Sequence, residues 1–120
     1  MKYILLTSGL LAALALTGGC AQPRSPSLYG WYGYEVQLDN WFKQDVESPD
    51  IQLQKMRQDL EKMKAANQLP PPGFRAHMGL LHGQLGDPVS LKRALEAEKA
   101  AFPESSAYMD FLLRHFNKAN

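Results

Sequence analysis

Apolar residues along this chain recur at steps of three and four positions, the spacing that places side chains on one face of an α-helix. The first such segment carries Tyr34, Leu38, Trp41, Phe42 and Val46. Four more segments follow, and connections that contain proline or glycine separate them. No segment alternates with a period of two for long enough to indicate a β-strand. The pattern therefore predicts an all-α chain of about five antiparallel helices.

Proline and glycine set the expected limits of these helices. Ser48-Pro49-Asp50 is a helix start, because serine caps an N-terminus well and proline fits the first helical position. Asp87-Pro88 repeats this signal, and the run from Pro70 to Gly73 cannot continue a helix. We expect helices at about 34–46, 49–67, 74–85, 88–102 and 105–116.

Within these segments the apolar spacing also predicts which side chains face inward. For the second helix they are Leu53, Met56, Leu60 and Met63. For the third helix they are Phe74, Met78, Leu81 and Leu85. For the fifth helix they are Tyr108, Phe111, Leu112 and Phe116.

The N-terminal region has a different pattern. Lys2 precedes an apolar run from Tyr3 to Leu16, which is too short for a permanent membrane-spanning helix. The run leads into Gly18-Gly19-Cys20, and Cys20 is the only cysteine. This arrangement resembles the lipobox of bacterial lipoproteins, which implies cleavage before Cys20 and lipidation of its thiol, with palmitate among the acyl chains. The alternatives are an ordinary secretory signal with a stray cysteine and a buried free cysteine in a cytosolic domain.

The expected organisation follows from these segments. We expect a lipoprotein signal peptide at 1–19, a lipidated N-terminus and flexible tether at 20–30, a helical-repeat domain at 31–117 and a tail at 118–120. Removal of the signal, with Lys2, lowers the formal charge from +1 to zero. A neutral domain gives no electrostatic reason to expect nucleic acid as a partner. A lipidated cysteine leaves no thiol for disulfides, zinc-thiolate sites or catalysis.

The sequence contains no recognisable catalytic or metal-binding motif. His77 and His82 are five residues apart, which places them on different helix faces, unlike the four-residue spacing of a helical zinc pair. Glu96 and Glu98 also point in different directions. Glu98 lies near the inward stripe, and we expect a structural role for it, as a buried acceptor for Arg75 or a helix-end donor. We expect no enzyme, no metal, no cofactor and no small-molecule substrate.

The third and fourth helices resemble a single degenerate tetratricopeptide repeat. Gly79, Gly86 and Pro103 stand where that repeat has a small residue, a turn glycine and a terminal proline. The departures from its pattern are Arg75, His82, Leu91 and Glu98. The resemblance implies tetratricopeptide-like hairpins with a capping C-terminal helix, because one such hairpin cannot bury its own apolar face.

A second resemblance covers about residues 29–113 and rests on a set of short motifs. They are Pro72-Gly73, Gly79, Gly86-Asp87, Glu98-Lys99, Phe102-Pro103-Glu104-Ser105 and Met109-Asp110. In these motifs the chain resembles a family of Gram-negative outer-membrane lipoproteins known as domain of unknown function 4810. The resemblance implies an outer-membrane lipoprotein encoded beside a lipoprotein of the curli-secretion pore type and another small lipoprotein. It carries no catalytic residues.

These observations predict a lipid-anchored, periplasm-facing adaptor that binds another envelope lipoprotein, with a pore-like one as the suspected partner. The expected contact residues are Trp31, Tyr32, Tyr34, Arg75 and His82. The last two are expected on the inner face of the first helix of a hairpin. Two alternatives stay open: an accessory activator or enzyme that acts on peptidoglycan, and a structural lipoprotein of the envelope.

Overall fold

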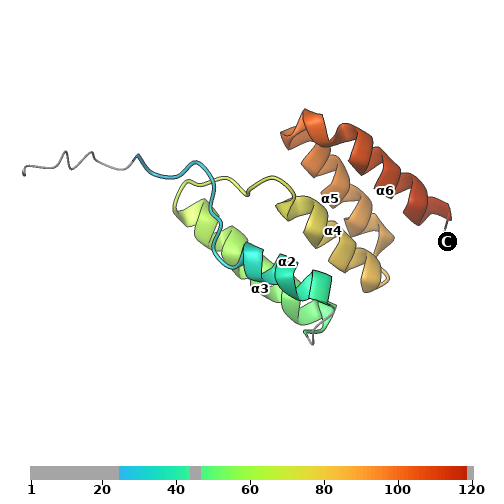
Figure 1. Cartoon of the computed structure of the whole chain (residues 1–120), viewed down its shortest axis with the longest axis horizontal. Helices are drawn as coiled ribbons and strands as arrows, with labels where there is room; N and C mark the ends of the chain where they lie inside the picture. Colours follow the sequence, from blue (N-terminus) through green and yellow to red (C-terminus); the bar gives the residue numbers. More distant parts are fainter. Residues whose placement is uncertain (1–24, 44–46, 119–120) are drawn as a thin grey trace, which may run out of the picture.

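The structure is a computed structural model that describes residues 25–43 and 47–118 (Figure 1). The described part contains α2 (Tyr34–Lys43), α3 (Pro49–Ala65), α4 (Phe74–Gln84), α5 (Pro88–Ala101), the 3₁₀ turn η1 (Pro103–Ser105) and α6 (Ser106–Lys118). The prediction of an all-α chain of about five helices is confirmed for these residues. Val46 and the predicted lipidation site, Cys20, lie outside them.

The helix starts follow the predicted local signals. Pro49 and Pro88 are the first residues of α3 and α5. The carboxylate of Asp87 caps α5 by accepting a hydrogen bond from the Ser90 backbone N–H at 2.9 Å. Gly86 precedes this cap with a φ of 76°, a left-handed conformation that favours glycine. The tight turn between α4 and α5 therefore results from local sequence.

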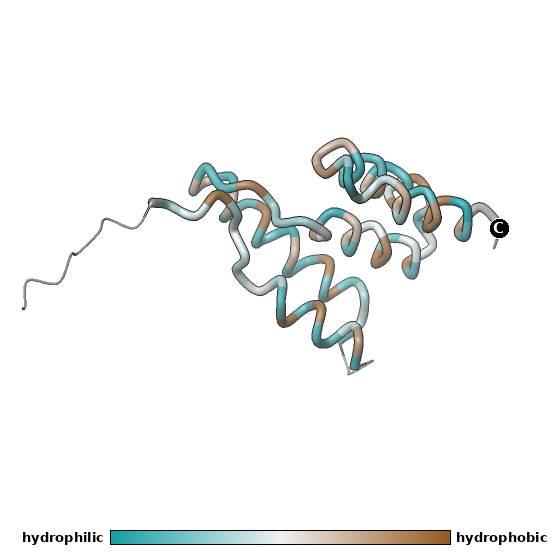
Figure 2. Tube along the Cα trace, turned by 45° about the horizontal axis from the view of Figure 1, so that its top comes forward, coloured by the Kyte–Doolittle hydropathy of each residue, from teal (hydrophilic) through white to brown (hydrophobic). Residues whose placement is uncertain are grey.

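The helices form a layered arrangement in which α4 has neighbours on both sides (Figure 1). On one side, α4 packs against α2 and α3 around a core of Tyr34, Leu53, Met56, Met63, Phe74 and Leu81. On the other side, it packs against α5 and α6 around a core of Ala76, Leu91, Leu95, Met109 and Leu112. Figure 2 shows that apolar and polar residues alternate along each helix, the pattern of amphipathic helices.

A close approach of α4 and α5 depends on Gly79. A Cβ atom at this position would lie 3.1 Å from the Cβ atom of Ala94 and 3.3 Å from the backbone oxygen of Leu91. Both distances are shorter than ordinary van der Waals contacts. The expectation that a small residue at position 79 lets the two helices approach closely is confirmed.

The prediction for the inward face of α6 is wrong for two aromatic residues. Tyr108 and Phe111 are 59% and 46% exposed, whereas Met109 and Leu112 are buried. The rings of Tyr108 and Phe111 stack on each other outside the core, with centroids 6.2 Å apart. Helical spacing alone gives two adjacent faces of α6 that are both apolar, and packing against α5 selects the face with Met109. Phe42 and Leu85, also expected inward, are exposed where α2 and α4 end.

A bridge ties the segment before α2 to the connection between α3 and α4. The Leu69 N–H donates to the Leu28 carbonyl at 2.9 Å, and the Gly30 N–H donates to the Leu69 carbonyl at 3.0 Å. Next to this pairing, the Tyr32 hydroxyl donates to the Gln68 side-chain oxygen at 3.1 Å, and the Trp31 ring stacks on Tyr34. In the described residues, no helix has both the length and the apolar character that crossing a bilayer demands.

Glu98 of α5 caps the N-terminus of α4. Its carboxylate accepts hydrogen bonds from three backbone N–H groups, those of Gly73 at 2.5 Å, Arg75 at 3.2 Å and Ala76 at 3.4 Å. Gly73, at the cap position, makes no side-chain cap of its own, so a residue from the neighbouring helix satisfies these donors. The side chain is 1% exposed, and the positive end of the α4 dipole favours its negative charge. The structural role expected for Glu98 is confirmed.

Tyr34 lies beside this cap. A Cβ atom on Gly73 would stand 2.6 Å from the Tyr34 hydroxyl oxygen, so residue 73 must be glycine for space as well as for its φ of 87°. Burial, together with the charge of Glu98, raises the pKa of Tyr34 to about 12. The tyrosine is therefore neutral, and it packs its ring on Phe74 with centroids 5.2 Å apart.

His77 occupies the core between α2 and α4. Its ring meets Trp41 edge to face, with centroids 5.1 Å apart, and only 4% of the residue is exposed. Its Nε2 atom has no hydrogen-bond partner among the described residues. Burial lowers the pKa of His77 from 6.5 to about 4, because the charged imidazolium would lose its hydration there.

We expect Glu98→Ala to destabilise the domain by about 3 kcal/mol, because three N–H groups at the start of α4 lose their acceptor. Glu98→Gln keeps an acceptor oxygen without the charge and should cost about 1 kcal/mol. Glu96→Ala, an exposed change on the same helix, serves as the matched control. Urea denaturation followed by circular dichroism measures the three free energies of unfolding. Equal stability of E98A and E96A would show that the cap contributes nothing.

The buried neutral His77 predicts a loss of stability in acid. Its pKa is lower in the folded state than in the unfolded state, so the unfolded chain takes up a proton first as the pH falls below 6.5. The loss continues down to about pH 4 and amounts to about 2 kcal/mol between pH 7 and pH 5. Chemical denaturation at several pH values measures this slope. His77→Gln should flatten the slope in this range, whereas His115→Gln, at an exposed position, should leave it unchanged.

Candidate functional site

A groove of about 280 Å³ lies where α3, α4 and α5 meet. Its lining residues are Leu60, Arg75, Met78, His82, Ser90, Arg93, Ala94 and Ala97. We call this surface the α3–α5 groove. It combines an apolar floor with three basic side chains.

Helical spacing explains how these residues come together. Arg75, Met78 and His82 follow one another at steps of three and four along α4, so they share one face across two turns. On α5, Arg93 and Ala97 are four residues apart and lie on another shared face. Small side chains at Ala94 and Ala97 leave room between the helices for the groove.

The charges of the α3–α5 groove are all of one sign. No aspartate or glutamate is among its lining residues. Arg75 and Arg93 make no ion pair with any residue in the ranges 25–43 and 47–118. The arrangement is therefore suited to hold a negatively charged group, since a guanidinium donates two parallel hydrogen bonds to a carboxylate.

Asp87 lies at the edge of the groove and is already engaged. Hydrogen bonds from the side chain and backbone of Ser90 hold the pKa of Asp87 below its usual value. Its second oxygen lies 3.3 Å from Nδ1 of His82. Aspartate, histidine and serine are the residue types of a hydrolase triad, but here Ser90 bonds the aspartate as a helix-capping partner. This geometry describes a capped helix start and gives Ser90 no activating base.

The structure separates the five predicted contact residues into three places. Arg75 and His82 both line the α3–α5 groove, as expected for one face of α4. Trp31 and Tyr32 are exposed on the segment before α2, outside the groove. Tyr34 is 4% exposed, so it is a core residue and offers no accessible surface for a partner. The spacing of aromatic residues at positions 29–34 does not distinguish these two environments.

Sequence reasoning missed Leu60, Arg93 and Ala97 as groove residues. Leu60 and Ala97 belong to the apolar stripes of their helices, which indicate burial rather than a site. Arg93 is one of two neighbouring exposed basic residues of α5 and has no distinguishing local signal. A weak signal was available in the combination of small residues at 94 and 97 with a basic residue at 93.

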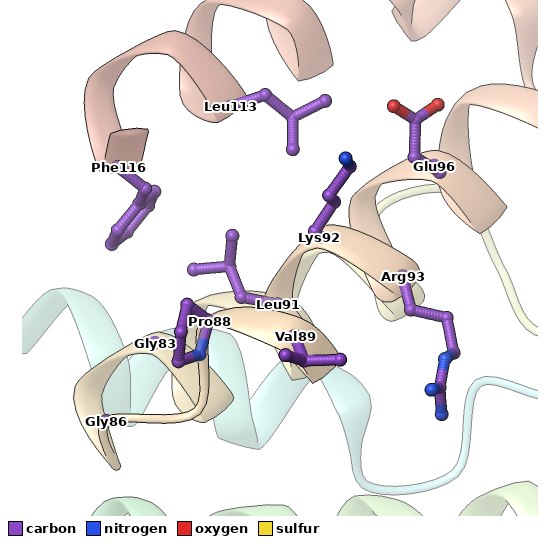
Figure 3. A pocket seen from close by; sticks show the side chains of 10 residues that line it. All are labelled: Gly83, Gly86, Pro88, Val89, Leu91, Lys92, Arg93, Glu96, Leu113 and Phe116. Atoms are coloured by element: carbon purple, nitrogen blue, oxygen red, sulfur yellow. The ribbon is translucent and has the colours of Figure 1, made fainter. Parts of the chain in front are cut away.

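A second hollow, of about 790 Å³, lies between α5, the C-terminal half of α6 and the turn after α4. Figure 3 shows Leu113 and Phe116 of α6 facing Leu91 and Pro88, with Lys92 and Glu96 at the rim. The Arg93 side chain points away from Leu113 and Phe116 (Figure 3). The walls of this hollow are mainly apolar. Its charged lining residues are Lys92, Arg93 and the oppositely charged Glu96, so it lacks the single-sign charge of the α3–α5 groove.

His77 and His82 lie on different sides of α4, as their five-residue spacing predicts. His77 faces the core with α2, whereas His82 faces the α3–α5 groove. Among the residues that the structure describes, no group of three histidine, cysteine or acidic side chains is arranged to hold a metal ion.

Comparison with known proteins gives one match. Residues 28–112 match the model of a family described as Domain of unknown function (DUF4810). No curated protein and no solved structure matches the chain. The matched residues include α2 to α5 and both arginines of the α3–α5 groove. Since the match spans well over half of its residues, the chain belongs to the DUF4810 family.

Proposed function

We propose that this chain is a lipid-anchored adaptor of the Gram-negative cell envelope, which binds a second envelope protein through the α3–α5 groove. The observation that supports this function most is the groove itself. It gathers two contact residues expected from the sequence, Arg75 and His82, on one recessed surface with an apolar floor. The proposed partner is a lipoprotein of the curli-secretion pore type, in an assembly with a further small lipoprotein.

The proposed anchor is an acylated Cys20 in the outer membrane, with the domain on the periplasmic side. Its support is the apolar run that ends at Gly18-Gly19-Cys20, together with the resemblance to outer-membrane lipoproteins. Each buried methylene contributes about 0.8 kcal/mol, so two or more acyl chains anchor a protein stably. Eight residues separate Cys20 from Tyr29, where the described bridge to Leu69 begins.

The proposed architecture is a pair of helical hairpins with a C-terminal cap. In this view α2 with α3 and α4 with α5 are tetratricopeptide-like hairpins, and α6 covers the second one. The close contact at Gly79 and the glycine turn at Gly86 support this view. Stacked hairpins create recessed surfaces that suit protein partners.

Replacement of Cys20 tests the anchor. We expect Cys20→Ser to release the protein from the membrane fraction, because the acylated thiol is lost. Mass spectrometry of the wild-type protein should find acyl chains on an N-terminal Cys20. Ser25→Ala, in the same segment, should leave both membrane association and acylation unchanged. A free, unmodified Cys20 thiol on the wild-type protein in cells would contradict the proposed anchor.

Co-purification tests the adaptor role. The full chain, purified from a mild-detergent extract, should bring the pore-type lipoprotein with it. Unrelated lipoproteins that are equally abundant in the same extract should not be enriched. Quantitative mass spectrometry of the eluates measures this enrichment. Recovery of the chain alone from cells that express both proteins would contradict the proposed function.

A further inference from the structure

The chemistry of the α3–α5 groove also indicates what kind of segment it binds. We infer that its occupant is a short segment of the partner protein that presents an acidic side chain beside an aliphatic one. This inference rests on the proposed adaptor function and deepens it. The acidic group lies between Arg75 and Arg93, and the aliphatic group lies on the apolar floor.

The first support is the positive charge that two helices bring to the groove, which is complementary to an acidic side chain of a partner. Arg75 projects from α4 and Arg93 from α5, and neither has an acidic partner within the described ranges. The nearby Asp87 is held by Ser90 and His82, and Glu61 of α3 pairs with Lys64 at 2.7 Å. The remaining acidic side chain near Arg93, Glu96 of α5, lines the second hollow and not the α3–α5 groove, so no acidic residue of the groove lining neutralises the two guanidinium groups.

This positive charge belongs to the groove and not to the whole chain. The chain has a formal net charge of only +1, with 13 basic and 12 acidic residues. Ion pairs engage other exposed lysines, such as Lys43 with Asp39 at 2.7 Å and Lys99 with Asp110 at 2.6 Å. Arg57, Lys92 and Arg114 also make no ion pair among the described residues, but only Arg75 and Arg93 line the same recess, so two unpaired cations face one groove.

The second support is the size and lining of the recess. A volume of about 280 Å³ is near the lower limit of ligand pockets, so it accepts one or two side chains rather than a folded surface. Leu60, Met78, Ala94 and Ala97 supply its apolar area. Methionine adapts its shape to different aliphatic partners. Partial exclusion of water by these residues strengthens the attraction between guanidinium and carboxylate groups.

Site-specific photo-crosslinking in living cells tests this inference with the full chain. A photoreactive amino acid at position 97 lies in the groove, and one at position 107, on exposed α6, serves as the matched control position. We expect an adduct from position 97 only. Mass spectrometry of the adduct should identify a partner segment with an aspartate or glutamate next to an aliphatic residue.

Charge reversal gives the decisive comparison. Arg75→Glu with Arg93→Glu should lower the yield of the position-97 adduct at least tenfold, and Arg114→Glu, on α6 outside the groove, should leave it unchanged. Replacement of the identified acidic residue of the partner by lysine should restore the adduct with the double variant. If circular dichroism shows that the double glutamate variant is unfolded, Arg75→Gln with Arg93→Gln replaces it, with the same expected loss.

The possible results separate this inference from the proposed function. An adduct that survives loss of both arginines, a mapped segment without an acidic residue, or an adduct with lipid or nucleic acid overturns the inference. A protein adduct from position 107 but not from position 97 also overturns it; such an adduct keeps the adaptor role but excludes the α3–α5 groove as its binding surface. Absence of any protein adduct at either position, together with recovery of the chain alone in co-purification, overturns both.

Discussion

The contact between the Glu98 carboxylate and the first turn of α4 holds the two central helices of this domain in register. Three backbone N–H groups of α4 share this one acceptor, which comes from α5. A helix that begins at a left-handed glycine has no side-chain cap of its own, so the cap must come from outside. The position of α4 along α5 is therefore set at one end by Glu98 and at the other by the Asp87 cap of the short turn.

The groove depends on this register. Arg75 belongs to the same turn of α4 whose backbone Glu98 caps, and Arg93 lies five residues before Glu98 on α5. A shift of one helix along the other would separate the two arginines and move His82 away from Asp87. Glu98 thus has two roles. It accepts hydrogen bonds from the backbone N–H groups at the start of α4, and it places the charged residues of the groove opposite one another. The buried anion is also one reason why Tyr34, at the same junction, stays protonated.

The packing of α4 on two sides accounts for the buried histidine. One side of α4 serves the core with α2 and α3, and the other serves the core with α5 and α6. A helix with neighbours on two sides keeps a narrow band for polar residues, and Arg75 with His82 occupies this band at the groove. His77 lies on the side of α4 that faces α2. There its ring packs against Trp41, and its Nε2 atom has no hydrogen-bond partner among the described residues. The same histidine makes this core sensitive to acid.

Local sequence by itself determined the number, order and limits of the helices, because caps, prolines and the spacing of apolar residues act within a few positions. It also predicted the small residue at Gly79, the structural role of Glu98 and the separation of His77 from His82. Only the tertiary structure decided which of two apolar faces of α6 is buried, that Tyr34 is core while Trp31 is exposed, and that Arg93 joins Arg75 across two helices. These outcomes depend on how each helix is rotated against its neighbours, and that rotation results from contacts between residues distant in the chain, which the periodicity of a single helix cannot encode.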